Sequence, residues 1–157
     1  MISVIIPTLN AAALLPRTLA PLVTGAAHGL VKQVIVADGG STDETLEIAD
    51  AAGCDIVVSP QGRAKQMRAG VAGAKGNWLL FLHADTALAQ NWVEEAARFI
   101  GAPRGRLRAA AFLSPGIAPD AIAIPVGQGH TNFTRYATNR GVNPIAILAP
   151  VTVPETG

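Results

Sequence analysis

The feature that most constrains the fold is an alternation of short apolar runs and helix-like segments in the first hundred residues. The apolar runs are residues 2–7, 32–38, 55–59 and 77–82. The helix-like segments are residues 14–24, 41–52, 63–75 and 91–100. Short runs rich in Val, Ile and Leu are typical of buried strands, and such strands separated by helices form parallel sheets covered on both faces. Because crossovers are right-handed, the sequence predicts a doubly wound, mostly parallel α/β domain.

Local signals indicate where individual helices begin and end. Pro16 suits the first turn of the first helix, whereas Pro21 is expected to bend it. The segment Ser41-Thr42-Asp43-Glu44 matches a capping box, which predicts that the second helix starts with a Ser41 cap. Gly53 is a natural stop for that helix.

Polar residues follow each of the four predicted strands. They are Pro7-Thr8-Leu9-Asn10, Asp38-Gly39-Gly40-Ser41, Gln61-Gly62-Arg63 and His83-Ala84-Asp85-Thr86. Ligands of open α/β sheets bind beyond the carboxyl ends of the strands, so a site is predicted at this edge. Asp38 precedes two glycines and a helix, where its carboxylate can accept hydrogen bonds from a ring N–H or from ribose hydroxyls. Asp85 follows the most apolar strand and can hold a hard divalent cation that bridges a diphosphate.

Each of these side chains also has a purely structural interpretation. Asp38 can start a turn, Asp85 can cap the segment that follows it, and His83 can be a packed histidine. Arg63 and Lys65 open the third helix, where they either neutralise phosphates or contact a base, or simply form a solvated face. These alternatives stay open at the level of single residues.

Composition and missing motifs exclude several classes. The net charge of +1 gives no bulk electrostatic basis for nucleic-acid binding, and the single cysteine, Cys54, excludes an internal disulfide and fits a reducing cytoplasm. No window approaches the roughly 20 apolar residues of a membrane span. The sequence also has no P-loop, no dinucleotide glycine fingerprint and no G-x-S-x-G elbow. We expect a cytoplasmic protein, with peripheral membrane contact left open.

Taken in order, the motifs resemble those of family 2 glycosyltransferases, which have the GT-A fold. The resemblance is carried by ISVIIPTLN at 2–10, VIVADGGSTD at 34–43, GRAKQM at 62–67 and LLFLHADT at 79–86. The last two segments are similar to a subgroup whose metal motif is His-Ala-Asp instead of Asp-x-Asp. The resemblance covers about residues 1–100.

The resemblance implies a nucleotide-sugar donor, commonly a UDP-sugar, and a Mg²⁺ or Mn²⁺ cofactor. It implies that Pro7 and Thr8 flank the base and ribose, and that Asp38 binds one of them. It places Arg63 near the base or phosphates, and Asp85 on the metal with His83 beside it. The remaining residues of the implied nucleotide site are Asn10, Gly39, Lys65 and Ala84. Two positions depart from the pattern, because His83 replaces an acid and Arg68 stands where the subgroup usually has Asn.

The pattern changes near Arg108, which divides the chain into a nucleotide-sugar-binding domain at 1–108 and a Pro- and Gly-rich tail at 109–157. Residues 109–113 form a candidate strand, and little regular structure is expected after residue 115. The family's acceptor-side half contributes a Gly-Asp-Gln-Gly-like segment and a Glu-Asp pair that supplies the base. Neither is recognisable, and Asp120 and Glu155 are the only acids beyond Arg108. The domain is therefore expected to be incomplete at its C-terminus, and a reading-frame shift is one hypothesis for the tail.

Three functions are compatible with these observations. The first is transfer of a sugar from a nucleotide diphosphate to an unknown acceptor hydroxyl. The second is a donor-binding fragment that turns over poorly because it lacks the general base. The third is a nucleotidyltransferase, although the Pro7-Thr8-Leu9-Asn10 loop is neither Gly-rich nor basic as that class would require.

Overall fold

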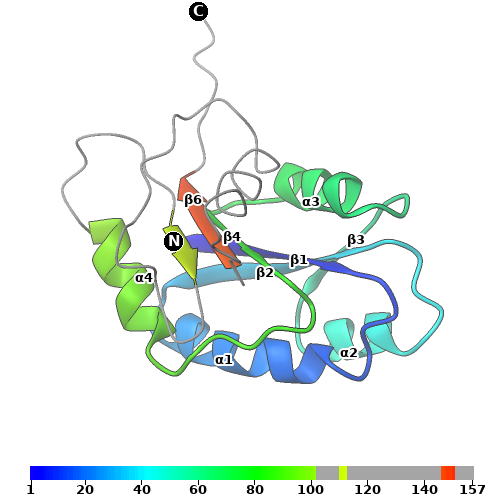
Figure 1. Cartoon of the computed structure of the whole chain (residues 1–157), viewed down its shortest axis with the longest axis horizontal. Helices are drawn as coiled ribbons and strands as arrows, with labels where there is room; N and C mark the ends of the chain where they lie inside the picture. Colours follow the sequence, from blue (N-terminus) through cyan, green and yellow to red (C-terminus); the bar gives the residue numbers. More distant parts are fainter. Residues whose placement is uncertain (102–109, 113–145, 151–157) are drawn as a thin grey trace, which may run out of the picture.

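The computed structural model describes residues 1–101, 110–112 and 146–150 (Figure 1). Strands and helices alternate through the first part of the chain, as the apolar pattern predicts. The elements are β1 Ile2–Thr8, α1 Leu15–Ala27, β2 Val31–Asp38, α2 Thr45–Ala51, β3 Asp55–Val58, α3 Arg63–Ala72, β4 Trp78–Leu82, α4 Trp92–Gly101, β5 Ala110–Phe112 and β6 Ala146–Pro150. None of the helices in these ranges combines the length and apolar character needed to cross a membrane.

The strands form one sheet in the order β3-β2-β1-β4-β6-β5. The pairs β1–β2, β1–β4 and β2–β3 are parallel, whereas β6 runs antiparallel to both β4 and β5. The chain moves outward from β1 to β3 and then returns to place β4 on the other side of β1. The strand order therefore reverses between β1 and β4, which is where ligands of doubly wound sheets bind. The predicted mostly parallel α/β fold is confirmed.

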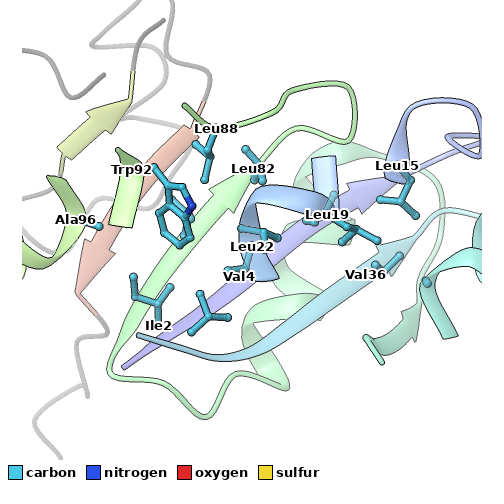
Figure 2. Packing of buried hydrophobic residues seen from close by; sticks show 14 of the residues in the cluster. Ile2, Val4, Leu15, Leu19, Leu22, Val36, Leu82, Leu88, Trp92 and Ala96 are labelled. Atoms are coloured by element: carbon cyan, nitrogen blue, oxygen red, sulfur yellow. The ribbon is translucent and has the colours of Figure 1, made fainter. Parts of the chain in front are cut away.

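Alternate residues of β1 pack into two hydrophobic clusters on opposite faces of the sheet. Ile2, Val4 and Ile6 belong to a large cluster with side chains from α1 and α4, whereas Ile5 belongs to a smaller one completed from α3. Figure 1 shows α3 on one face of the sheet and α1 with α2 on the other. Figure 2 shows the indole of Trp92 beside α1 side chains in the large cluster. This side chain is 2% exposed, and its Nε1 donates a 2.9 Å hydrogen bond to the Pro21 carbonyl.

One prediction about regular structure was wrong. Helix α2 begins at Thr45 after a Glu44 N-cap without a side-chain cap, so Ser41 is not the cap. The Ser41 hydroxyl instead donates to Asp38, a contact that the local sequence does not reveal. Beyond residue 115 the described residues form one short strand, β6, which the sequence pattern did not indicate. An unpaired β4 would leave its outer backbone groups without partners, and an apolar segment far along the chain supplies them.

The other tail predictions fall partly outside the described residues. Strand β5 confirms the candidate strand at 109–113. Asp120 and Glu155 lie outside the described residues, as does most of the tail to which the reading-frame hypothesis applies.

Candidate functional site

A cleft of about 380 Å³ lies at the strand-order reversal, next to the carboxyl ends of β1 and β4. The described residues that line it come from the β1–α1 segment, the start of α3 and the segment after β4. They are Pro7, Thr8, Leu9, Asn10, Ala11, Leu14, Gln61, Gly62, Arg63, Gln66, His83, Ala84 and Asp85. Most of the predicted site residues therefore converge on one cleft. Asp38, Gly39 and Lys65 are not among its lining residues.

Asp38 lies just behind the cleft wall, where its side chain is held entirely within the chain. The Asp38 residue is 1% exposed. The register between β1 and β2 pairs it with Thr8, which brings the two side chains together. One carboxylate oxygen accepts hydrogen bonds from the Thr8 and Ser41 hydroxyls at 2.8 and 2.5 Å. The other accepts from the backbone N–H groups of Gly40 and Ser41 at 2.9 and 2.8 Å.

These four bonds determine the charge state of Asp38. Burial raises its pKa, but the hydrogen bonds from Ser41, Thr8 and Gly40 outweigh burial, so the pKa lies below the usual value. Asp38 is therefore ionised at neutral pH. A nucleotide that contacted it directly would have to replace or share one of these four donors.

Asn10 joins the loops that follow β1 and β2. Its backbone has φ 51°, a left-handed conformation that Asn tolerates better than most residues. Its side-chain oxygen accepts from the Thr42 N–H at 2.8 Å, and its own N–H donates to the Ser41 hydroxyl at 2.8 Å. Asp43 continues the link by accepting from the Ala12 N–H at 3.1 Å. The first wall of the cleft is thus a hydrogen-bonded pair of loops.

A second wall contains His83, Ala84 and Asp85. Burial and the positive charge of Arg63 lower the pKa of His83, whereas Asp85 partly offsets them, so the imidazole is neutral at neutral pH. Asp85 is exposed, and one of its oxygens accepts from the Thr86 hydroxyl at 3.1 Å. The neutral imidazole and the carboxylate therefore share one segment of the cleft.

The third wall is the N-terminal end of α3. Gly62 has φ 139°, which only glycine adopts readily, and it turns the chain into the helix at Arg63. Arg63 lines the cleft with an exposed side chain. Lys65 is also exposed but does not line the cleft, which agrees with a solvated helix face.

Comparison with known proteins shows which family this chain belongs to. The family model described as "Glycosyl transferase family 2" matches residues 3–115. The chain belongs to glycosyl transferase family 2. The resemblance predicted from the four motifs is confirmed, and it extends slightly beyond the expected residue 100.

A curated relative is the PGL/p-HBAD biosynthesis glycosyltransferase of Mycobacterium bovis. It is 40% identical over 109 residues, which cover 64% of this chain and 42% of the relative. The matched region therefore spans about two fifths of the relative's length.

Solved structures share the fold of this family 2 chain. Glucosyl-3-phosphoglycerate synthase of Mycobacterium tuberculosis, solved with Mn²⁺, UDP and phosphoglyceric acid, matches with a TM-score of 0.67 and 21% identity. The match covers 96% of this chain and 55% of that one. Staphylococcus aureus TarS, solved with UDP-GlcNAc, matches with a TM-score of 0.55 and 24% identity, covering 70% of this chain and 39% of that one. The expected GT-A fold is confirmed.

The potential metal ligands that line the cleft fit a divalent cation bound together with a diphosphate. Asp85 offers a carboxylate and His83 a neutral imidazole, and both are suitable ligands. Among the described residues no cluster of three or more His, Cys, Asp or Glu could hold a metal alone. A cation here would therefore take its remaining ligands from phosphate oxygens and water, as Mg²⁺ commonly does.

The sequence did not single out several cleft residues. Leu9 and Leu14 are 40% and 46% exposed, which is high for large apolar side chains at a cleft. Gln66 is the opposite case, because it is polar and only 4% exposed. Gln66 lies within the GRAKQM segment and one helical turn after Arg63, but a sequence alone does not show that such a side chain is buried.

Proposed function

We propose that the cleft binds the nucleoside diphosphate part of a sugar donor, most simply a UDP-sugar, as the donor half of a glycosyltransferase. The observation that carries this proposal is the convergence of Thr8, Arg63, His83 and Asp85 on one cleft at the strand-order reversal. Family membership and the UDP-containing structures with the same fold support it.

Within this proposal, residues of the three walls bind different parts of the donor. Pro7 and Thr8 flank the base and ribose, and Arg63 places a positive charge near the base or the diphosphate. Asn10 keeps the β1 loop in place through its bonds to Thr42 and Ser41. Gly39 lies behind the cleft, where the absence of a side chain leaves room for Gln66 beside the end of β2.

Asp38 acts on the nucleotide either directly or through Thr8, because the Thr8 hydroxyl donates to its carboxylate. Both routes predict that Asp38→Ala weakens UDP binding. Thr8→Val separates them, because it breaks only the Thr8 bond. An equal loss in the two variants supports action through Thr8, and a much larger loss in Asp38→Ala supports direct contact.

Asp85 would hold Mg²⁺ or Mn²⁺, with His83 beside it and Ala84 between them. The cation supplies a positive charge that stabilises the diphosphate leaving group. His83 takes part as a neutral imidazole, which can either bind the cation or donate a hydrogen bond to a phosphate oxygen.

A donor-binding protein without efficient turnover is the second candidate function. Inverting transfer needs a carboxylate that removes the acceptor proton, and Asp85 is the only acid among the described residues that line the cleft. In this proposal Asp85 binds the metal, so no acid among the described cleft residues is left to act as the base.

Two assays distinguish the candidates. UDP release from UDP-glucose and UDP-N-acetylglucosamine, with and without an alcohol acceptor, measures hydrolysis and transfer. Calorimetry with the same donors measures binding. Binding with turnover supports the enzyme, whereas binding without turnover supports the donor-binding protein, and an absence of binding contradicts both.

A further inference from the structure

Gln66 uses its side-chain amide to join three segments behind the cleft. It lies one turn into α3 and is only 4% exposed. Its Nε2 donates to the backbone carbonyls of Thr8 and Ala37 at 2.7 and 2.9 Å. Its Oε1 accepts from the Gly62 N–H at 3.2 Å. Both amide protons and one acceptor position are therefore used.

The three partners of Gln66 each belong to or adjoin a residue of the proposed site. Thr8 is the last residue of β1 and lines the cleft, Ala37 directly precedes Asp38, and Gly62 directly precedes Arg63. A single side chain thus bonds to the ends of β1 and β2 and to the start of α3. The Gln66 amide therefore links these three segments.

The surroundings leave little freedom for this amide to move. A Cβ at Gly39 would lie 2.9 Å from Gln66 Oε1 and 3.0 Å from its Cδ, so the absence of a side chain at Gly39 makes room for Gln66. The Gly39 N–H also donates to the Thr8 carbonyl at 2.9 Å, the same oxygen that Gln66 contacts. The Gly39 position is therefore matched to the Gln66 side chain.

We infer that Gln66 is a positioning residue for the nucleotide site, acting through Thr8 and through Gly62 on Arg63. The inference rests on the proposed function, because the site it orders is the proposed donor cleft. Gln66 fixes the separation between the Thr8 wall and the Arg63 wall. Without its amide, the Thr8 and Ala37 carbonyls each lose one donor, and the hydrogen bonds that join the two walls through Gln66 are lost.

Two substitutions remove this function in different ways. Gln66→Leu removes every hydrogen bond of the side chain while keeping a buried side chain of similar size. Gln66→Glu keeps the acceptor for Gly62 but, when ionised, presents oxygens to the Thr8 and Ala37 carbonyls. Protonation of the introduced carboxyl group restores one donor, and burial against carbonyl oxygens favours the protonated form.

Ser3→Ala is the matched control at the opposite end of β1. Ser3 is fully buried, and its hydroxyl donates to Gln33 Oε1 at 2.7 Å and accepts from the Gly76 N–H at 2.8 Å. Its loss should lower stability without changing the cleft. It therefore separates a general loss of packing from a specific loss of positioning.

The test is calorimetric titration of the full chain with UDP and Mn²⁺ at pH 8 and pH 5.5, alongside the thermal unfolding midpoint of each variant. We expect Gln66→Leu and Gln66→Glu to weaken UDP binding by about tenfold or more at pH 8, the loss of about one hydrogen bond. Relative to the original chain at each pH, Gln66→Glu should recover affinity at pH 5.5 and Gln66→Leu should not. Ser3→Ala should lower the midpoint and leave UDP affinity unchanged.

Four results would overturn the inference. Folded Gln66→Leu with unchanged UDP affinity shows that the amide does not order the site. If Gln66→Leu does not fold, Gln66→Glu decides alone, and an affinity deficit that is the same at both pH values counts against the inference. An equal affinity loss in Ser3→Ala shows a general packing effect. Failure of the unmodified chain to bind UDP would overturn the proposed function, and this inference with it.

Discussion

The hydroxyl of Thr18 in α1 donates a 2.7 Å hydrogen bond to the backbone carbonyl of Ala84, in the middle of the His83–Asp85 segment. Thr18 is fully buried, whereas Ala84 is half-buried at the edge of the cleft. It joins the first helix to the wall that carries the proposed metal ligands. The placement of Asp85 therefore depends on packing as well as on its own strand.

Thr18→Val should weaken the effect of metal on UDP binding. Valine has nearly the shape of threonine but leaves the Ala84 carbonyl without this donor, which costs about 1–3 kcal/mol of unfolding free energy. We expect the tightening of UDP binding by Mn²⁺ to fall severalfold, measured by calorimetry with and without Mn²⁺. Thr18→Ser keeps the hydroxyl and should retain the effect. Undiminished metal enhancement in Thr18→Val would show that this bond does not orient Asp85.

Asp85→Ala should remove the metal-dependent part of UDP binding and spare uridine binding, because the nucleoside does not reach the cation. The measurement is UDP affinity as a function of Mn²⁺ concentration. Asp50→Ala is the control, since Asp50 is an exposed acid on α2 that does not line the cleft. Equal metal enhancement in Asp85→Ala and in the control would exclude Asp85 as the principal ligand.

Asp38 should make folding stability depend on acid pH. Its pKa is lowered in the folded state, so its contribution is fully present above the usual value of 3.8 and is lost as pH falls through the folded-state pKa. Asp38→Asn should lower the unfolding free energy by about 2 kcal/mol at pH 7. The asparagine amide has one acceptor oxygen, so the donors that bond to the other Asp38 oxygen lose their acceptor. Urea unfolding of both proteins between pH 7 and pH 2.5 checks this. The difference in unfolding free energy should shrink below about pH 4, and a constant difference would contradict the assignment.

Gly25→Ala should destabilise the fold although alanine is the better helix former. A Cβ at Gly25 would lie 2.5 Å from the Trp92 ring and 2.7 Å from Val31 Cγ2, so the core would have to shift. We expect Gly25→Ala to lower the unfolding free energy by about 1–3 kcal/mol. At a helix position with free space, the same substitution raises the unfolding free energy by up to about 1 kcal/mol. Gly101→Ala at the end of α4 is the control, because no described atom lies within 4 Å of its Cβ position. Denaturant unfolding that ranks the two variants equally would refute this.

The strands and the position of the cleft were predictable because their signals are local. Each apolar run is continuous, and the polar segment that follows it needs only the topology of a parallel sheet to be placed at the correct edge. Thr8 and Asp85, far apart in sequence, lie on one cleft because β1 and β4 are neighbours.

What escaped prediction depends on contacts between distant segments. Ser41 looks like a helix cap in sequence, but its hydroxyl bonds to Asp38 and to the Asn10 N–H. Gln66 looks like an ordinary polar residue of an exposed helix until the ends of β1 and β2 are placed beside it. Strand β6 is a short apolar run between prolines, and it is recognisable as a strand only through its pairing with β4 and β5.

The central claim is that the cleft is a metal-assisted site for a uridine diphosphate. Calorimetric titration of the full chain with UDP, with and without Mn²⁺ and compared with UMP, tests it most directly. The account predicts that UDP binds, that Mn²⁺ tightens UDP binding, and that UMP gains much less from the metal because it lacks the second phosphate. A folded chain that binds neither UDP nor UMP, or that binds both equally well with and without Mn²⁺, would contradict the claim.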